Sequence, residues 1–202
     1  MKTAIIASAL LITAASFLYS CTSSSGNTTA APDSTSTANN YGGFASQEEW
    51  GKHIVTISGC NDCHSPKTMT AQGPVVDATK ALSGAPSPAP LPNATAEQIA
   101  KGMAATIDMT AWVGPWGKSY AANITSDSTG IGNWTEQQFA DCLRKGIYKG
   151  ISGTRPLMPP MPWQDFSNMS DNEIKAVFAY LKSTKPVHNV VPQYEPPTMA
   201  KR

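Results

Sequence analysis

Three residues, Cys60, Cys63 and His64, form the pattern with the clearest chemistry, in the run Cys-Asn-Asp-Cys-His. C-x-x-C-H is the attachment signature of c-type haem. Two cysteines three residues apart reach the two vinyl groups of a porphyrin as thioethers, and the next residue then lies under the iron, where an imidazole nitrogen binds axially. Because the motif occurs once, the sequence predicts one covalent haem c, with His64 as an axial ligand of its iron.

Three other interpretations of the cysteine pair remain open. A zinc site needs two more ligands in a second cluster, and Cys142, His53 and His188 form no such cluster in the sequence. A thioredoxin-like redox motif has a strand before it and a helix after it, whereas the sequence before Cys60 predicts a helix. The last alternative is a plain disulfide or a chance pair.

A second axial ligand is expected in residues 157–163, whose sequence is LMPPMPW. Methionine is often the second ligand of haem iron in electron carriers. Proline fixes the backbone angle φ, which lowers the cost of holding a sulfur atom against the iron. Met158 and Met161 are therefore the candidate ligands, with His53 and His188 as alternatives.

Three segments with a capping-box start are expected to form the helices that position these residues. They are Ser46–Glu49, Thr135–Gln138 and Ser170–Glu173. In this pattern the side chain of a Ser or Thr accepts a hydrogen bond from the backbone N–H three residues later. The side chain of a Glu or Gln at that later position accepts one from the backbone N–H of the Ser or Thr. Apolar residues then recur at helical spacing, so each helix has one buried stripe. We expect these helices to end at Gly59, near Gly146 and before Pro186.

Residues 65–132 lack a comparable pattern and are rich in Pro, Gly, Ala and Thr, which predicts turns and loops. Thr95 can open a short fourth helix, and residues 109–112 equally fit a strand, so this part is left open. Three short helices make a small core for some 150 residues, and the haem is expected to fill it. The predicted fold is therefore all-α, with three main helices around one haem and a long loop-rich insertion.

Residues 1–20 are predicted to be a lipoprotein signal peptide. A positive start is followed by an uncharged apolar run from Ala4 to Leu18, which is short for a membrane span. Residues 18–21 (LYSC) resemble a bacterial lipobox, in which a small residue precedes a cysteine that is lipidated and becomes the new N-terminus. Cys21 is the predicted lipidation site. The alternative is an ordinary secretory signal, and both export the chain from the cytoplasm.

Residues 21–42 are predicted to be a lipidated cysteine and a flexible tether. Ten of the 19 residues from 22 to 40 are Ser or Thr, so the segment has too little apolar area to offset the entropy lost on ordering. The predicted domain then spans residues 43–192, and a tail follows at residues 193–202. A lipid anchor would hold this domain at a membrane of the bacterial cell envelope, on the periplasmic side.

The composition argues against a nucleic-acid-binding protein. The chain of 202 residues has 15 basic and 14 acidic side chains and a formal net charge of +1. Charged residues make up 14% of the chain, against roughly 25% in an average soluble protein. A nucleic-acid-binding protein needs a basic stripe that replaces phosphate counterions. No nucleic-acid partner is therefore expected.

The order of these features resembles a class I cytochrome c. The closer resemblance is to the haem modules of cytochrome c subunits that serve periplasmic membrane-bound dehydrogenases for alcohols, aldehydes and sugars. The residues that carry it are Gly114-Pro-Trp-Gly117, Asn123-Ile-Thr-Ser-Asp127, Thr129-Gly-Ile-Gly132, Trp134, Phe139, Leu143-Arg-Lys-Gly146, Met161-Pro162-Trp163 and Ala179-Tyr-Leu181. In that family the methionine of the Met-Pro pair is the axial ligand. This implies Met161 rather than Met158, because Met161 is followed by Pro162 and an aromatic residue.

The resemblance implies one-electron transfer between a periplasmic or membrane dehydrogenase and a respiratory acceptor. The expected partners are redox proteins: a dehydrogenase, an oxidase or another cytochrome. The chain is then an electron carrier and not an enzyme. The alternatives are a sensor or enzyme with a five-coordinate haem c, and a metal-binding lipoprotein without haem.

Several further residues have expected roles around the haem. Pro66 or Pro74 is expected to offer a backbone carbonyl to the distal nitrogen of His64, which would fix the imidazole ring. The candidate hydrogen-bond donors to the haem propionates are Trp116, Trp134, Trp163 and Arg155. Cys142 is expected to be a buried, inert thiol on the apolar face of the second helix.

Overall fold

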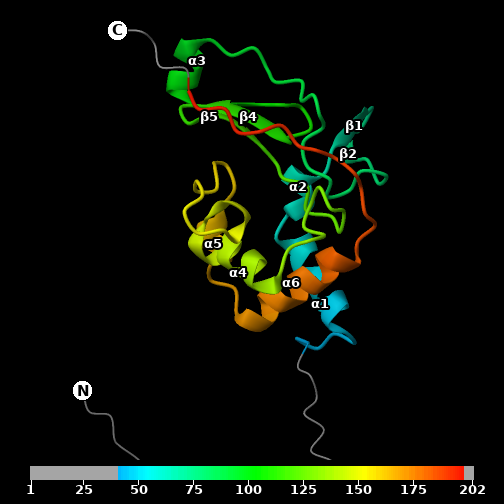
Figure 1. Ribbon diagram of the computed structural model, residues 1–202. Coiled ribbons are helices and arrows are strands. Elements are labelled where there is room, and N and C mark those ends of the chain that lie inside the picture. Colours follow the sequence, from blue (N-terminus) through cyan, green and yellow to red (C-terminus); the bar gives the residue numbers. More distant parts are fainter. Residues whose placement is uncertain (1–40, 198–202) are drawn as a thin grey trace, which may run out of the picture. The chain divides into compact units, whose positions relative to one another are not determined.

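The computed structural model describes residues 41–197, and Figure 1 shows how their helices and strands are arranged. The predicted signal peptide (1–20), the lipidation site Cys21 and most of the predicted tether lie outside the described residues, as do residues 198–202 of the predicted tail. Within the described part of the chain, no helix is long and apolar enough to cross a membrane.

The three helices expected from the capping patterns are present. They are α1 (Gln47–Ile57), α4 (Glu136–Lys145) and α6 (Asp171–Ser183). The caps Thr135 and Ser170 form complete capping boxes, whereas Ser46 only accepts a bond from the backbone N–H of Glu49, at 3.1 Å. Helix α4 stops at Gly146, whose φ of 62° is the left-handed conformation that glycine adopts at helix C-termini.

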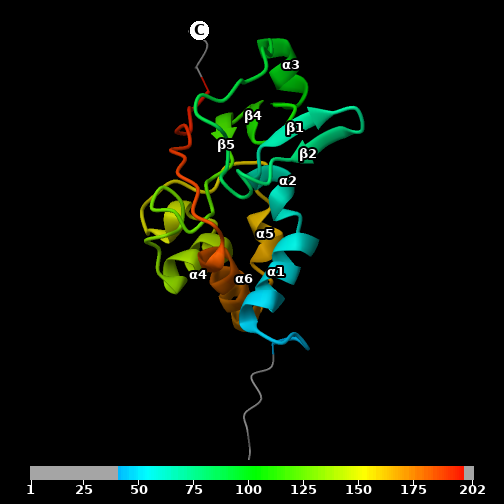
Figure 2. The same ribbon diagram turned by 90° about the vertical axis from the view of Figure 1, so that its right-hand side faces the viewer.

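Helices α1 and α6 cross in close contact, as Figures 1 and 2 show. Gly51 makes this approach possible, because a Cβ atom at this position would lie 1.9 Å from the backbone oxygen of Ala176. The buried apolar residues around this crossing form the main core: Ile54, Val55, Leu82, Ile131, Phe139, Leu143, Ile174, Ala176, Val177 and Leu181. Most of them come from α1, α4 and α6, so the three helices provide most of the apolar core.

The predicted all-α fold is wrong, because the segment expected to be loop contains two small antiparallel sheets. Strand β1 (Lys67–Thr70) pairs with β2 (Gly73–Val76), and Figure 2 shows this hairpin beside α2. In the second sheet, β4 (Ala111–Gly114) lies between β3 (Ala104–Ala105) and β5 (Gly117–Tyr120). The fold of the described residues is mixed α/β.

The remaining helical segments are short: α2 (Cys60–His64), α3 (Ala96–Lys101), α5 (Trp163–Phe166) and the 3₁₀ turn η1 (Tyr148–Gly150). The two structures that the sequence left open between residues 95 and 112 both exist, one after the other. Thr95 caps α3 with a complete capping box, and β4 begins at Ala111.

The strands escaped prediction because each has only two to four residues, too few for an alternating pattern to stand out. Their pairing depends instead on tight turns and on the rest of the fold. Gly117 has a φ of 103°, and a Cβ atom there would lie 2.1 Å from the backbone oxygen of Glu195. This close approach joins β5 to a segment that follows about 75 residues later.

That segment, residues 186–195, is named here the C-terminal strap, and Figure 1 shows it running from α6 back across β4 and β5. The side-chain amide of Asn189 donates to the carbonyls of Ser83 and Ala85 at 2.7 and 2.8 Å. Further along, Glu195 forms an antiparallel bridge with Lys118. The strap thus connects the C-terminal end of α6 with the second sheet.

Candidate functional site

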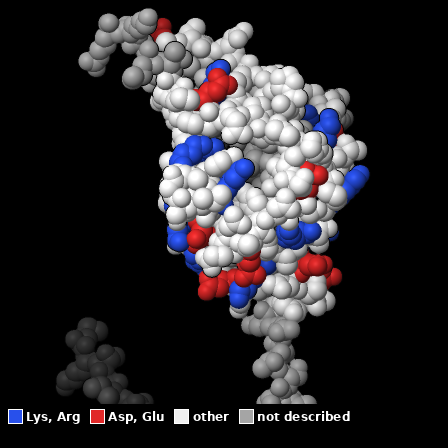
Figure 3. Space-filling model, viewed as in Figure 1, with Lys and Arg blue, Asp and Glu red and all other residues white. Residues whose placement is uncertain are grey.

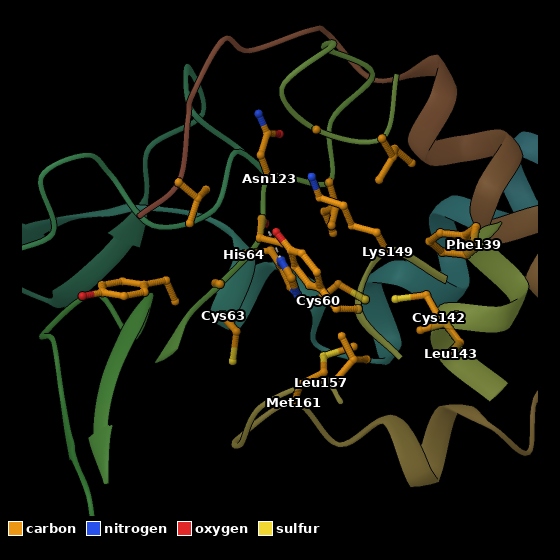
Figure 4. A pocket seen from close by; sticks show the side chains of 18 of the residues that line it. Cys60, Cys63, His64, Asn123, Phe139, Cys142, Leu143, Lys149, Leu157 and Met161 are labelled. Carbon is orange, nitrogen blue, oxygen red and sulfur yellow. Dashed lines mark hydrogen bonds between the residues drawn. The ribbon is translucent and has the colours of Figure 1, made fainter. Parts of the chain in front are cut away.

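One cavity of about 680 Å³ lies between the helices, the second sheet and the C-terminal strap. Cys60, Cys63, His64 and Met161 all line it, as does Met158. Figure 4 shows the thiols and His64 coming from α2, while Met161 comes from the segment just before α5. The structure thus brings together all four residues that the sequence predicted to hold a haem, although 97 positions separate His64 from Met161.

The C-x-x-C-H residues form a single helical turn, α2, directly after α1. Gly59 precedes this turn with a φ of 66°, so the chain changes direction between the two helices. Residues three and four apart share one face of a helix, which places Cys60, Cys63 and His64 on the same side. Hydrogen bonds of Ser65 hold this turn in place. The Ser65 hydroxyl donates to the side chain of Asn61 and accepts a bond from the backbone N–H of Leu82, both at 2.8 Å.

The His64 ring is fixed by a hydrogen bond. Its Nδ1 lies 2.7 Å from the backbone oxygen of Ala122, and not beside the predicted carbonyl of Pro66 or Pro74. A carbonyl oxygen can only accept, so the ring proton is on Nδ1, and Nε2 keeps its lone pair for a ligand. Burial lowers the pKa of His64, which favours the neutral imidazole that metal ions bind.

The segment with the two candidate methionines is attached to both sides of the pocket. The backbone N–H of Leu157 donates to Gly146 at the end of α4, at 2.7 Å. On the other side, the Ser119 hydroxyl of β5 donates to the carbonyl of Pro159 at 2.6 Å. Met161 is partly buried against the main core. The segment is therefore held between α4 and β5 with Met161 at the pocket.

The three described cysteines are free thiols. Burial raises the pKa of Cys60 and of Cys142 to about 11, and it also raises the pKa of Cys63. In residues 41–197 no three His, Cys, Asp or Glu side chains gather as a metal site, and the element before Cys60 is a helix. The zinc and thioredoxin-like alternatives therefore find no support in the described residues.

Only two of the four predicted hydrogen-bond donors to the haem propionates lie at the cavity. Trp134 and Arg155 line the cavity, whereas Trp116 and Trp163 are not among its lining residues. Trp116 donates its indole N–H to Ser119 at 3.0 Å. Trp163 packs on Gly146, where a Cβ atom would lie 2.3 Å from the indole.

Sequence reasoning missed several lining residues. Lys149 lies in the 3₁₀ turn η1 with a φ of 57°, and no sequence pattern marked it. The strap residues from Val190 to Tyr194 also line the cavity, including two that belong to the predicted tail. Apart from Gln193, their only sequence signal was their apolar or aromatic character.

No known protein-family model matches this chain, but part of the chain is similar to dehydrogenase subunits. It is 39% identical over 79 residues to a nicotinate dehydrogenase subunit of Pseudomonas putida, covering 39% of this chain and 6% of that one. It is 41% identical over 75 residues to the cytochrome c subunit of the quinone-type alcohol dehydrogenase of Gluconobacter oxydans, covering 36% and 15%. The fructose dehydrogenase cytochrome subunit of Gluconobacter japonicus is 38% identical over 85 residues, covering 41% and 17%.

These matches support a cytochrome c-type module. The chain spans only 6–17% of the length of these three relatives, so the similarity concerns a single module of much larger proteins.

Proposed function

We propose that this chain binds one haem c covalently and carries single electrons, without catalysing a reaction of its own. The observation that carries the proposal is the convergence of Cys60, Cys63, His64 and Met161 on one cavity. When bound, a haem c supplies a one-electron redox centre. The cavity volume lies within the range of roughly 300–1,000 Å³ of pockets for small molecules and cofactors, and its donor set is that of a c-type haem.

In this proposal each residue has a definite role. Cys60 and Cys63 hold the ring through two thioethers, and His64 offers Nε2 to one face of the iron. The Ala122 carbonyl keeps the imidazole in orientation and makes it a stronger donor. Met161 would offer its sulfur as the second protein ligand of the iron. With a protein ligand on both faces, no position is left for a substrate, which favours a carrier over an enzyme or gas sensor.

The similarity to dehydrogenase subunits supports a dehydrogenase as the electron donor. In the same proposal the acceptor is a respiratory protein. The predicted export signal is consistent with this, because haem c is attached outside the cytoplasm. In the same proposal, lipidation at Cys21 anchors the chain to the bacterial envelope, facing the periplasm.

The test is covalent attachment of haem followed by removal of single ligands. The full chain is expressed in a host that matures c-type cytochromes, and the denatured gel band is stained for haem peroxidase activity. The wild-type band is expected to stain, and the band of the variant Cys60→Ser, Cys63→Ser is expected to lose the stain. An unstained wild-type band would overturn the proposal.

Methionine ligation is tested separately in the stained protein. The oxidised wild type is expected to have the near-infrared charge-transfer band of a sulfur ligand. Met161→Ala is expected to lose this band, and the matched control Met158→Ala is expected to keep it. Rapid binding of CO to the reduced wild type would instead indicate an open iron site and would overturn the role of carrier.

A further inference from the structure

The charged side chains that line the cavity are all of one sign. Two are present, Lys149 and Arg155, and no Asp or Glu is among the lining residues. Figure 4 shows the Lys149 side chain extended along the pocket, and Figure 3 shows Lys and Arg side chains bordering the hollow on that face. A mostly apolar pocket with two cations fits a ligand with two negative charges.

Both cations come from one closed loop, residues 146–157. Its two ends meet where Leu157 donates to Gly146 at 2.7 Å and where Tyr148 donates to Arg155 at 2.9 Å, both between backbone groups. The loop lies directly on α4, because a Cβ atom at Gly150 would be 1.8 Å from the backbone oxygen of Gln138. The loop therefore holds Lys149 and Arg155 at a fixed edge of the cavity.

Arg155 is positioned by aromatic rings and has no anionic partner among the described residues. Its guanidinium carbon lies 4.0 Å from the ring centre of Tyr148 and 5.3 Å from that of Tyr194. Within residues 41–197 the guanidinium makes one hydrogen bond, to the carbonyl of Pro156 at 2.9 Å. Burial lowers its pKa, although a guanidinium stays charged in proteins. Most of its five N–H donors are thus left for another acceptor.

Lys149 is exposed, but it also lies beside the Tyr148 ring and has no anionic partner among the described residues. Its Nζ lies 5.4 Å from the ring centre of Tyr148. In the described part of the chain, no carboxylate lies within 4.0 Å of the charged groups of Lys149 or Arg155. Arg155 is partly buried, and a partly buried cation without a counter-charge is unfavourable. The pairing of Arg with a carboxylate is among the strongest hydrogen-bonded contacts.

We propose that Lys149 and Arg155 bind the two propionate carboxylates of the haem, so that its carboxylate edge faces the 146–157 loop. This inference rests on the proposed function. The charges balance, with two cations for two carboxylates. The assignment agrees with the thioethers at α2, because the propionates lie on an edge of the ring away from the vinyl groups.

The test is the reduction potential of the covalent haem protein, measured between pH 5 and pH 8. Removing a cation leaves a propionate charge uncompensated, which favours the oxidised iron, so Arg155→Gln and Lys149→Gln are both expected to shift the potential downward. The paired propionate of the wild type is expected to stay ionised over this range. In Arg155→Gln its pKa is expected to rise, so the potential falls with increasing pH, whereas Arg155→Lys is expected to restore a flat profile.

The matched control is Lys145→Gln, since Lys145 lies on α4, pairs with Asp141 at 3.0 Å and does not line the cavity. The other titratable side chains at the cavity, apart from the residues of α2, are Tyr120, Cys142, Tyr148 and Tyr194. Phenols are ordinarily uncharged between pH 5 and 8, and burial raises the pKa of the Cys142 thiol to about 11. A new inflection in this range therefore reports on the propionates.

The outcomes separate this inference from the proposed function. If the wild type takes up no haem, the proposed function itself is wrong. If the variants stain for haem and keep the methionine band, but their potentials and pH profiles equal those of Lys145→Gln, the assignment of Lys149 and Arg155 is wrong. If Arg155→Gln attaches no haem, Lys149→Gln decides alone, and an unshifted potential overturns the proposal.

Discussion

The two sides of the cavity are stabilised by different interactions. The helical side, formed by α1, α4 and α6, is held by apolar side chains such as Ile174 and Leu181, each 2% exposed. The other side consists of the second sheet, the loop after it and the C-terminal strap, and here the buried residues include many polar ones. The buried polar residues of the described chain are Ser65, Ser83, Thr106, Thr110, Ser119, Asn123 and Thr125.

All of these buried polar residues lie between positions 65 and 125, and none belongs to the three main helices. No buried side-chain nitrogen or oxygen atom among the described residues is without a hydrogen-bond partner. The stabilisation from apolar burial has no preferred direction and is roughly proportional to the buried area. A buried polar group instead destabilises the fold once its hydrogen-bond partner is removed. The helical side should therefore respond to lost volume, and the sheet side to lost hydrogen bonds.

The largest loss in the free energy of unfolding is expected on the helical side, for the substitution Ile174→Ala. Deleting a buried Ile side chain removes its transfer free energy and leaves a cavity, which costs about 2–5 kcal/mol. The measurement is urea unfolding of the haem-loaded protein by far-ultraviolet circular dichroism. Ile174→Val is the graded control, with an expected loss of about 0.5–1.5 kcal/mol. Equal losses for the two variants would contradict a side stabilised by apolar volume.

A smaller effect is expected for Asn123→Ala, which tests the polar side. Asn123 donates to Thr129 and Val187 at 3.0 and 2.9 Å, and it accepts from the backbone N–H of Thr125 at 3.0 Å. The substitution leaves the buried Thr125 and the partly buried Thr129 and Val187 without this partner, which costs about 1–3 kcal/mol in the free energy of unfolding.

Hydrogen exchange locates that effect. In Asn123→Ala, the backbone N–H of Thr125 loses its acceptor and is expected to exchange faster, while the amides in the middle of α6 keep their protection. Asn123→Asp is the control, because it keeps the acceptor and loses the donors. A uniform loss of protection across α6 would show that the two sides do not differ in this way.

The smallest effect is expected for Glu195→Gln, at the end of the strap. Its carboxylate lies 2.8 Å from Lys118 Nζ and accepts the Tyr120 hydroxyl at 2.9 Å. Both charged side chains are about half exposed, so the loss is expected to stay below about 1 kcal/mol.

The pH dependence identifies this contribution. Hydrogen bonds from Lys118 and Tyr120 hold the pKa of Glu195 below its ordinary value of 4.5. A carboxylate with a lowered pKa in the folded state stabilises the fold above the unfolded pKa, and this stabilisation disappears as the pH falls through the folded pKa. The difference in stability between wild type and Glu195→Gln, measured by thermal unfolding, should therefore be largest near pH 6 and become smaller below pH 4.5. A difference that grows on acidification would refute this account.

The same contrast explains what the sequence predicted. The caps Thr135 and Ser170 bond to groups three residues away, so the three helices follow from local patterns. The turn that presents Cys60, Cys63 and His64 is equally local. By contrast, the carbonyl that holds His64 comes from a residue 58 positions later.

The parts that escaped prediction depend on contacts between distant segments. Asn189 reaches Ser83 across 106 positions, and no local pattern encodes such a pairing. Lys149 reaches the cavity through a left-handed φ that is uncommon for a residue with a side chain. Met161 was predicted as a site residue because prolines surround it, but its place beside α2 depends on the whole fold.

The strap also sets the order in which the cavity can be completed. The strap, residues 186–195, follows every helix and strand of the described chain, so a ribosome makes α2 long before it makes the strap. Until Asn189 reaches Ser83 and Glu195 reaches Lys118, the cavity lacks one of its sides. The turn with Cys60 and Cys63 is therefore made before the strap, and it is open on that side until the strap reaches its place.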